Sequence, residues 1–513
     1  MDWLRRLLPT VLLLIIVLLG AWLRFVSIGA KTVWLDEAFS IWIAHHTLPD
    51  LWSWLIRIDQ HPPLYYSLLH FWQALFGDLQ GAVRSFSALC STLTLPLFYL
   101  VAVRLLNRST ALIATLVLAL SPVHIRFAQE ARMYAFLTLA VAVALWCLVH
   151  ILCDEERRPL RKWWLGLAAA QAAVMLTHNT ATVFFPLALN LGVGGALLWK
   201  YWQGGVSSWP ALNDSVFERR WVRGQALAFI LWLPWSVPFV IQAVGVDRKF
   251  WLPPPTVETV WQVLHNFNVA FVPDWVPLFP AWDLLYWLLA VLGVISLRRT
   301  PARGLLLLTL WLAPLVGELL VSLRRPIFYE RTILWVTLPY YLLLAVGIRW
   351  LGSAEKERYL WLRRAVQTLV VALIIVLSTT GLTGYFFFFE KEEWNKAAAY
   401  VAEQAAPGDV VVFNATWVQL PFDYYFRHYN TGTELRGLPV DLFERGELEP
   451  QMTEEDLPQL RSLADEHRRI WLVYSHDWYT DPQQIIPREF SRLMRRTDQR
   501  QFAGLQVMRF ESR

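Results

Sequence analysis

The sequence predicts a polytopic α-helical membrane protein that ends in a soluble α/β domain, and three observations support this prediction. Apolar residues make up 56% of the 513-residue chain, whose mean hydropathy is +0.38; this is more apolar surface than one soluble core can house. Apolar segments close to the roughly 20 residues that cross a bilayer recur up to residue 388. Beyond that point the composition becomes charged and polar. We therefore expect a membrane module over residues 1–388 and a soluble domain over residues 389–513.

The membrane module is predicted to contain about eleven transmembrane helices. Each corresponds to an apolar segment near the length that spans the hydrocarbon layer. The segments cover residues 9–28, 83–104, 110–127, 133–152, 163–177, 180–200, 224–244, 281–297, 304–323, 331–350 and 365–385.

The distribution of Lys and Arg predicts the orientation of the chain in the plasma membrane. Cytoplasmic loops carry the excess of these residues, and with eleven spans the basic clusters all fall on one side, around residues 5–6, 104–108, 157–162, 219–223, 298–303 and 356–364. The N-terminus is then cytoplasmic and the C-terminal domain extracytoplasmic. The first segment lacks a small-residue cleavage site and is expected to remain as an anchor. The net charge of +5 is mostly this topology signal and indicates no nucleic-acid partner.

The first exterior loop, residues 29–82, contains an adjacent acid pair, Asp36 and Glu37. Acids beside a bilayer are costly to desolvate and often handle protons, ions or substrates, although both could also lie in water at a helix end. Two apolar stretches follow, at 48–58 and 62–76. Pro62 and Gly77 frame the second as a helix of about fifteen residues, which we expect to lie flat on the outer membrane surface. A twelfth, tilted span is the alternative.

A second exterior acid lies in the short turn between the third and fourth predicted spans. This turn contains Glu130 and Arg132 and leads into Tyr134. Folding of the helices could bring Glu130 close to Asp36, whereas a simple surface pair of Glu130 with Arg132 would contribute only about 0–1 kcal/mol. Both readings remain open from the sequence.

Three motifs in this order resemble the bacterial glycosyltransferases of the dolichyl-phosphate-mannose protein mannosyltransferase type, of the GT-C superfamily, which also includes the aminoarabinose transferases that modify lipid A. The motifs are Trp-Leu-Asp-Glu-Ala-Phe-Ser at 34–40, His-Pro-Pro-Leu-Tyr-Tyr at 61–66 and Ser-Pro-Val-His-Ile-Arg-Phe-Ala-Gln-Glu-Ala-Arg-Met-Tyr at 121–134. The resemblance covers roughly residues 1–350 and is strongest over 1–140.

The resemblance implies a transferase that moves a sugar from a polyprenyl-phosphate carrier to an acceptor outside the membrane, without a nucleotide sugar or other cofactor. The acceptor could be a protein, a glycolipid or a polysaccharide. The resemblance gives Asp36 the role of general base, with Glu37 orienting it or binding the acceptor. Glu130 is a further candidate catalytic residue, because folding could bring it close to Asp36. A carboxylate that removes the acceptor proton during a single displacement would invert the anomeric centre.

Cations near the outer membrane surface are expected to bind the lipid phosphate that leaves. We favour Arg331, with Arg325 and Arg132 as rivals, although an Arg at this depth could also simply extend its charge to the interface. His61 occupies the position where the aminoarabinose transferases carry a Lys, and it is the weaker cation at neutral pH.

The predicted substrate pocket contains Tyr134, His178 and Asn179. The last two lie in the short outer turn between the fifth and sixth spans and could instead cap a helix. No HExxH, CxxC or Asp-x-Asp pattern occurs at these sites, so we predict no metal.

The C-terminal domain is predicted from two continuous apolar strands, 410–414 and 470–474, which are typical of a sheet covered on both faces. Residues 394–404 and 420–429 are expected to be helical and 432–456 to carry turns. The domain could bind acceptor or glycan, or merely cap the helices; no Gly-rich phosphate loop is present.

A polytopic transporter is the alternative function. Its site would lie near the bilayer midplane on interrupted helices, often in repeated halves, whereas the acids and cations of this chain lie at the outer ends of spans. A binding protein or sensor would not need eleven spans.

Overall fold

The computed structural model describes residues 2–513 except 60, 154–159, 205–206, 208, 246–253, 278–280, 354–358, 416, 430 and 443–449, with the backbone alone for 2–6 and 244–245. The chain forms two compact units. The membrane unit comprises Met1–Val26, His61–Tyr65 and Arg84–Phe389. The sheet unit comprises Ser27–Gln60, Tyr66–Val83 and Glu390–Arg513, so it contains most of the first loop as well as the C-terminal residues.

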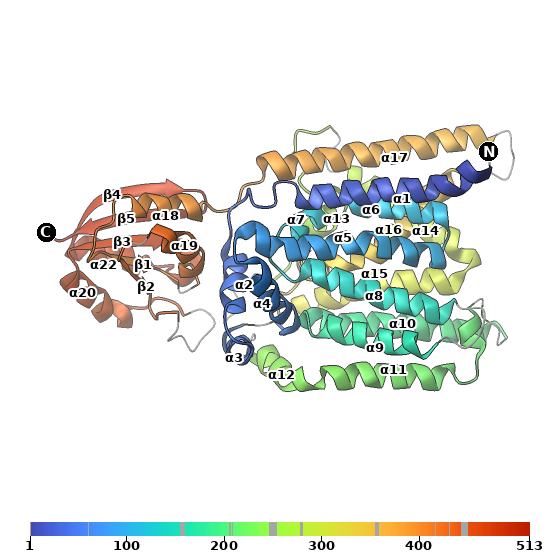
Figure 1. The fold of residues 1–513 in the computed structure, drawn as a ribbon, viewed down its shortest axis with the longest axis horizontal. Coiled ribbons are helices and arrows are strands. Elements are labelled where there is room, and N and C mark those ends of the chain that lie inside the picture. Colours follow the sequence, from blue (N-terminus) through green and yellow to red (C-terminus); the bar gives the residue numbers. More distant parts are fainter. Residues whose placement is uncertain are drawn as a thin grey trace. The chain divides into compact units, whose positions relative to one another are not determined.

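Most helices of the membrane unit are long and run alongside one another, and a few are short (Figure 1). They are α1 (Asp2–Phe25), α5 (Gln80–Leu105), α6 (Arg108–Leu120), α7 (Pro122–Ala128), α8 (Tyr134–Leu152), α9 (Arg161–Met175), α10 (Asn179–Trp202), α11 (Phe217–Trp232), α12 (Ser236–Gly245), α13 (Val257–Val269), α14 (Trp282–Ser296), α15 (Pro301–Ser322), α16 (Thr337–Leu351) and α17 (Leu360–Thr383). The predicted fold class, a polytopic helical protein with a small C-terminal sheet domain, is confirmed.

The number of spans differs from the prediction. Among the described residues, eight helices are long and apolar enough to cross a membrane, or nine if α6 and α7, which meet at 58°, form one broken span. The other two expected spans are the helices α9 and α14, which have 15 residues each. Fifteen residues rise only about 22 Å, short of the roughly 30 Å hydrocarbon layer. The count of eleven is therefore not confirmed.

Small residues allow the closest helix packing in the membrane unit. A Cβ added at Gly347 would lie 1.9 Å from the carbonyl oxygen of Leu289, and one at Gly293 would lie 2.1 Å from that of Leu343. Both pairs join α14 to α16, so these two backbones are in direct contact. Close approach through glycine is how helices gain packing energy where no hydrophobic driving force exists between them.

The sheet unit contains a five-stranded sheet with the order β2-β1-β3-β5-β4. Strands β1 (Val410–Phe413), β2 (Glu434–Gly437) and β3 (Arg469–Tyr474) are parallel, while β5 (Leu505–Glu511) runs antiparallel to both β3 and β4 (Arg495–Phe502). The register pairs Val410 with Ile470, and Ile470 with Phe510.

Helices cover both faces of this sheet, which explains the continuous apolar sequence of β1 and β3. Helices α18 (Trp394–Ala402) and α19 (Gln419–Phe426) pack on one face, and α20 (Leu457–Glu466) and α22 (Ile485–Leu493) on the other. The expected strands and the expected helices 394–404 and 420–429 thus all form. The sequence analysis missed β2, in a stretch assigned to turns, and the β4–β5 hairpin. Part of that stretch, 443–449, lies outside the described residues.

The first loop folds into three short helices, α2 (Leu35–Ala44), α3 (Leu48–Ile58) and α4 (Leu64–Phe76). Gly77 ends α4 with a φ of +80°, a conformation that glycine adopts without strain. With 13 residues, α4 is not among the helices long enough to span a membrane in the described chain, so a twelfth span is not supported. Its position flat on the membrane surface stays a prediction.

Candidate active site

The acid pair belongs to the first turn of α2, where the positive end of the helix dipole favours negative charge. Leu35 precedes it and is only 5% exposed, because its side chain enters the apolar core formed by α18, α19 and one face of the sheet. The backbone amide of Val33 donates to the hydroxyl of Tyr425 on α19, at 2.8 Å. Helix α2 is thus fixed to the C-terminal residues just before Asp36.

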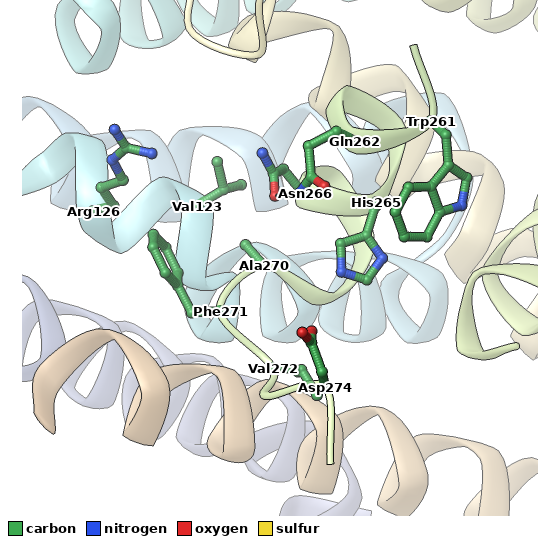
Figure 2. Close-up of a pocket in the computed structure, with 10 residues that line it drawn as sticks. All are labelled: Val123, Arg126, Trp261, Gln262, His265, Asn266, Ala270, Phe271, Val272 and Asp274. Atoms are coloured by element: carbon green, nitrogen blue, oxygen red, sulfur yellow. Dashed lines mark hydrogen bonds between the residues drawn. The ribbon is translucent and has the colours of Figure 1, made fainter. Parts of the chain in front are cut away.

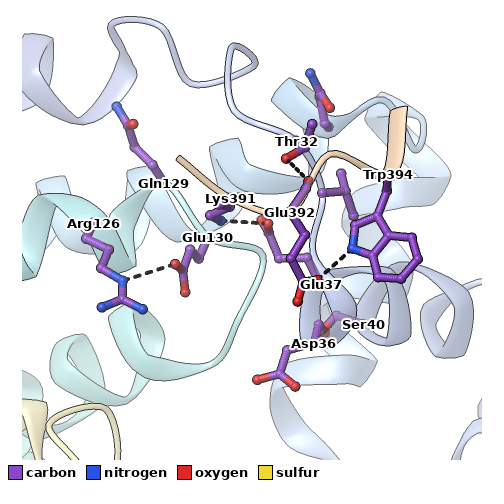
Figure 3. A network of polar contacts seen from close by, with 12 residues as sticks. Thr32, Asp36, Glu37, Ser40, Arg126, Gln129, Glu130, Lys391, Glu392 and Trp394 are labelled. Carbon is purple, nitrogen blue, oxygen red and sulfur yellow. Dashed lines mark hydrogen bonds and ion pairs between the residues drawn. The ribbon is translucent and has the colours of Figure 1, made fainter. Parts of the chain in front are cut away.

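The two acids have different surroundings. The Glu37 carboxylate is fully buried and accepts a hydrogen bond from Nζ of Lys391 at 2.9 Å (Figure 3). The ammonium group of Lys391 also lies 5.7 Å from the ring of Trp34. Asp36 is only half-buried. The pair therefore presents Asp36 as the accessible carboxylate and keeps Glu37 in an internal ion pair.

Further contacts fasten the first loop to α19 and to Arg427, which follows it. Arg427 donates to the carboxylate of Asp78 at 2.6 Å, and His45 lies 3.1 Å from the same oxygen. The backbone oxygen of Asp78 accepts from the hydroxyl of Tyr424 at 3.0 Å. These bonds and the burial of Leu35 make the loop and the C-terminal residues one structural unit.

In the membrane unit, the turn after α7 holds a second polar group (Figure 3). Arg126 donates from Nε to Glu130 at 3.3 Å and from Nη1 to Glu330 at 3.4 Å, and its guanidinium lies 5.0 Å from the ring of Phe127. The Glu130 side chain is fully buried. Arg126, near the end of α7, is therefore an ion-pair partner of Glu130, which lies in the turn that follows the helix. Arg126 is not among the residues predicted from the sequence.

Several predicted residues converge at one end of the membrane unit. The rings of His61 and His178 are 5.3 Å apart, those of Tyr134 and His178 are 6.1 Å apart, and the guanidinium of Arg132 lies 5.9 Å from the Tyr134 ring. Burial, together with the positive charges of His61, Arg132 and Arg331, holds the pKa of His178 well below its usual value. His178 is thus a neutral ring near the guanidinium groups of Arg132 and Arg331, an arrangement suited to an anion.

Other predicted residues are engaged elsewhere in the membrane unit. Nδ1 of His178 accepts from the amide of Thr180 at 3.3 Å, so His178 also caps α10, as the alternative reading proposed. Asn179 donates to the side-chain oxygen of Gln242 at 3.0 Å. Arg325 donates to the backbone oxygen of Ala243, whereas the guanidinium of Arg331 lies 5.5 Å from the ring of Tyr329. Of Arg325 and Arg331, only Arg331 contributes to the lowered pKa of His178.

A cavity of about 530 Å³ opens beside α7 in the membrane unit (Figure 2). Helix α7, helix α13 and the segment after α13 provide its lining, which consists of Val123, Arg126, Trp261, Gln262, His265, Asn266, Ala270, Phe271, Val272 and Asp274. The ring of Trp261 stacks on that of His265 at 4.8 Å, and Asp283 accepts from Nδ1 of His265 at 2.8 Å. Arg126 thus belongs to the cavity wall and to the acid cluster around Glu130.

The cavity could not be predicted from the sequence, because most of its polar lining residues lie on α13, a short helix without a motif. The sequence does contain one indication of a polar helix face here. Trp261, His265 and Asn266 alternate with buried apolar residues at helical spacing. No group of three His, Cys, Asp or Glu side chains that could hold a metal ion occurs within the described ranges.

Comparison with known proteins adds independent information. A family model described as dolichyl-phosphate-mannose-protein mannosyltransferase matches residues 60–212. An uncharacterized protein of Aquifex aeolicus (strain VF5) is 28% identical over 172 residues, which are 32% of this chain and 34% of that protein. The similar segment therefore spans about a third of the length of this curated relative.

Two kinds of solved structure resemble the whole chain. Apo ArnT from Cupriavidus metallidurans aligns with a TM-score of 0.63 at 14% identity, covering 97% of each chain. The archaeal oligosaccharyltransferase AglB from Archaeoglobus fulgidus aligns with a TM-score of 0.60 at 10% identity, covering 99% of this chain and 74% of AglB. The chain thus shares its overall fold with these two solved structures. Its residues 60–212, which contain the second and third motifs, match the dolichyl-phosphate-mannose-protein mannosyltransferase family model.

Proposed function

We propose that this protein is a membrane glycosyltransferase that moves a sugar from a polyprenyl-phosphate carrier to an acceptor hydroxyl. The observation that supports it most is the framework around Asp36, which leaves one carboxylate accessible while its neighbour Glu37 is neutralised by Lys391. The resemblance to ArnT and AglB adds support, since ArnT was solved bound to undecaprenyl phosphate and AglB in complex with an inhibitory peptide and a dolichol-phosphate.

Asp36 acts as the general base in this proposal. Its carboxylate takes the proton of the acceptor hydroxyl while the hydroxyl oxygen attacks the anomeric carbon and the lipid phosphate leaves with the bonding electrons. This single displacement inverts the anomeric centre. Glu37 serves to orient α2 through its bond to Lys391.

The cations around His178 are assigned to the lipid phosphate. Arg331, Arg132 and His61 supply positive charge to one region of the membrane unit, as their common effect on His178 indicates. Positive groups that are already in place stabilise the negative charge that develops on the leaving phosphate. Arg325 has a smaller role here, because it is engaged with the backbone of α12.

The cavity beside α13 is assigned to the sugar of the donor. The indole of Trp261 can pack on a sugar ring. The amides of Gln262 and Asn266 and the carboxylate of Asp274 can exchange hydrogen bonds with sugar hydroxyls. The buried pair of Arg126 with Glu130 holds the guanidinium at the cavity wall. Tyr134 and Asn179 belong to the surroundings of the donor.

We further propose that transfer takes place on the outer face of the plasma membrane, with the N-terminus in the cytoplasm and the sheet unit outside. The basic residues of alternate loops support this orientation. The acceptor is a protein, glycolipid or polysaccharide.

The test is sugar transfer in proteoliposomes that present the sheet unit to the medium. A panel of radiolabelled polyprenyl-phosphate sugars is offered to the wild type, to Asp36→Asn and to a matched control, Glu390→Gln, which removes an exposed acid of the same unit. We expect the wild type and the control to release lipid phosphate, and Asp36→Asn to bind donor without turnover. If the wild type consumes no donor and instead moves a solute across the bilayer, the protein is a transporter and the proposal is wrong.

A further inference from the structure

Glu318 is a buried acid in a helix that could span the membrane. Within the described residues, such helices contain two acids, Glu218 in α11 and Glu318 in α15. Glu218 is exposed, whereas Glu318 is 0% exposed. One carboxyl oxygen of Glu318, Oε1, is buried and has no hydrogen-bond partner in the described part of the chain. An acid at such a position is costly to retain and usually serves a function.

The other carboxyl oxygen of Glu318, Oε2, contacts the segment that follows α15. It lies 2.8 Å from the hydroxyl oxygen of Thr332. One helical turn after Glu318, the hydroxyl of Ser322 accepts from the backbone amide of Ile327 at 3.1 Å. The segment 327–332 is thus attached to α15 at both of its ends.

This segment connects Arg331 to the surroundings of His178. Arg331 directly precedes Thr332, whose backbone oxygen accepts from the hydroxyl of Thr180 at 3.4 Å. The Thr180 hydroxyl also lies 3.0 Å from Nδ1 of His178. A continuous series of contacts therefore runs from Glu318 through Thr332 and Thr180 to His178.

The hydrogen bonds around Thr332 indicate that Glu318 is a neutral carboxylic acid. Three oxygens surround the Thr332 hydroxyl: Oε2 of Glu318 at 2.8 Å, and the backbone oxygens of Tyr329 at 2.9 Å and Ile327 at 3.3 Å. The hydroxyl has one hydrogen to donate. When it donates to a backbone oxygen, Oε2 must itself donate and therefore carries a proton. Burial of an ionised carboxylate with one oxygen unbonded would be far more costly than burial of the neutral acid.

We propose that Glu318, as a neutral acid, is a positioning residue for Arg331. This inference rests on the proposed function, in which Arg331 binds the lipid phosphate. The Glu318–Thr332 bond after Arg331 and the Ser322–Ile327 bond before it fix the backbone on both sides of the cation. They thereby limit the directions that the guanidinium can take. A cation that is already in place stabilises the charge on a leaving phosphate best.

The experiment measures the Kd of undecaprenyl phosphate with the full-length protein in detergent. Glu318→Leu and Thr332→Val each break the bond between these side chains, and each should raise the Kd about fivefold to tenfold, the value of one hydrogen bond. In Glu318→Gln the amide can still donate to the Thr332 hydroxyl, so the Kd should stay within about twofold of the wild type. The exposed control Glu218→Leu should match the wild type.

A double-variant cycle distinguishes positioning from general destabilisation. In an Arg331→Ala background, Glu318→Leu should change the Kd by less than about twofold, because the guanidinium that it positions is gone. The infrared difference spectrum between the wild type and Glu318→Gln at pH 7 should contain the carbonyl band of a protonated carboxyl group. If Glu318→Leu does not fold, Thr332→Val in both backgrounds decides the question.

Three results would overturn this inference and leave the transferase proposal intact. They are an unchanged Kd in Thr332→Val, an equal effect of Glu318→Leu with and without Arg331, and a loss in Glu318→Gln as large as in Glu318→Leu. Absence of the infrared band would show that Glu318 is ionised, against the inference. If the wild type neither binds undecaprenyl phosphate nor transfers sugar from any donor of the panel, the proposed function fails and the inference fails with it.

Discussion

Replacing Lys391 by Met should destabilise the sheet unit and inactivate the protein together. The change leaves the apolar stem roughly in place but removes the ammonium group that bonds Glu37 at 2.9 Å. The side chains of both partners are buried, with exposures of 5% and 0%. Glu37 is then left as a buried carboxylate that must lose its charge or disrupt the start of α2.

The expected size follows from this burial. Removing one partner of a buried ion pair costs about 3–5 kcal/mol, because the charge that remains in the interior loses its counterion. A domain of this size loses about 2–4 °C in Tm per kcal/mol, so Tm should fall by roughly 6–20 °C. The double variant Glu37→Leu/Lys391→Met removes both charges and should recover most of the loss, since an apolar replacement of a buried pair is often close to neutral.

The assay is thermal unfolding of the purified protein in detergent, followed by sugar transfer at a temperature where each variant is folded. Lys396→Met is the matched control, because the Lys396 side chain is 64% exposed and pairs with Glu393 at the surface. A Tm for Lys391→Met within about 2 °C of the wild type would refute the reasoning, as would a double variant no more stable than the single one.

The remaining predictions concern chemistry and binding. Asp36→Asn should lower kcat by about 10²–10⁴ with donor affinity retained, as measured by single-turnover transfer. Trp261→Ala should raise the donor KM roughly tenfold, for about 1.5 kcal/mol of lost ring contact, without changing kcat; an unchanged KM would remove the cavity from the donor site. Arg331→Ala should weaken binding of the lipid phosphate by about 1.5–3 kcal/mol, measured by titration, and Arg325→Ala should weaken it less. Burial raises the pKa of Glu392 in the folded protein to about 7, so between about pH 4.5 and 7 the folded state keeps a proton that the unfolded chain has lost. The free energy of unfolding therefore falls as pH rises through this window. Glu392→Gln should be more stable than the wild type by up to about 3 kcal/mol at pH 8, and no more stable at pH 4.

Short-range sequence patterns correctly predicted the helices and strands that such patterns determine, namely α3, α4 and β1. Pro at the start and Gly at the end correctly framed α4, and the apolar stretch at 48–58 is α3. The all-apolar run at 410–413 is a strand because helices cover both faces of the sheet. The polar hairpin strand β4 was missed because it lies at the sheet edge, where charged residues are favoured and no apolar pattern is needed.

The partners of the predicted site residues could not be read in the same way. Lys391 is 354 positions from Glu37, and no local rule connects them. Arg126 was within reach of local reasoning, since it stands only four residues before Glu130 in the chain. The cavity beside α13 depends on three segments meeting, and its chemistry becomes visible only once they are folded.

The burial of Leu35 in the core of the C-terminal residues limits how this chain can be divided. A shortened protein that stops at residue 389 would retain every membrane helix, yet α2 would lose the apolar core beneath Leu35, the Tyr425 hydroxyl that holds Val33 and the counterion of Glu37. Exchanging the C-terminal part with that of a related protein would have the same effect unless residues 27–60 and 66–83 are exchanged with it. Recombination of natural sequences should respect the same boundary, so substitutions in the first loop are expected to co-vary with those after residue 390.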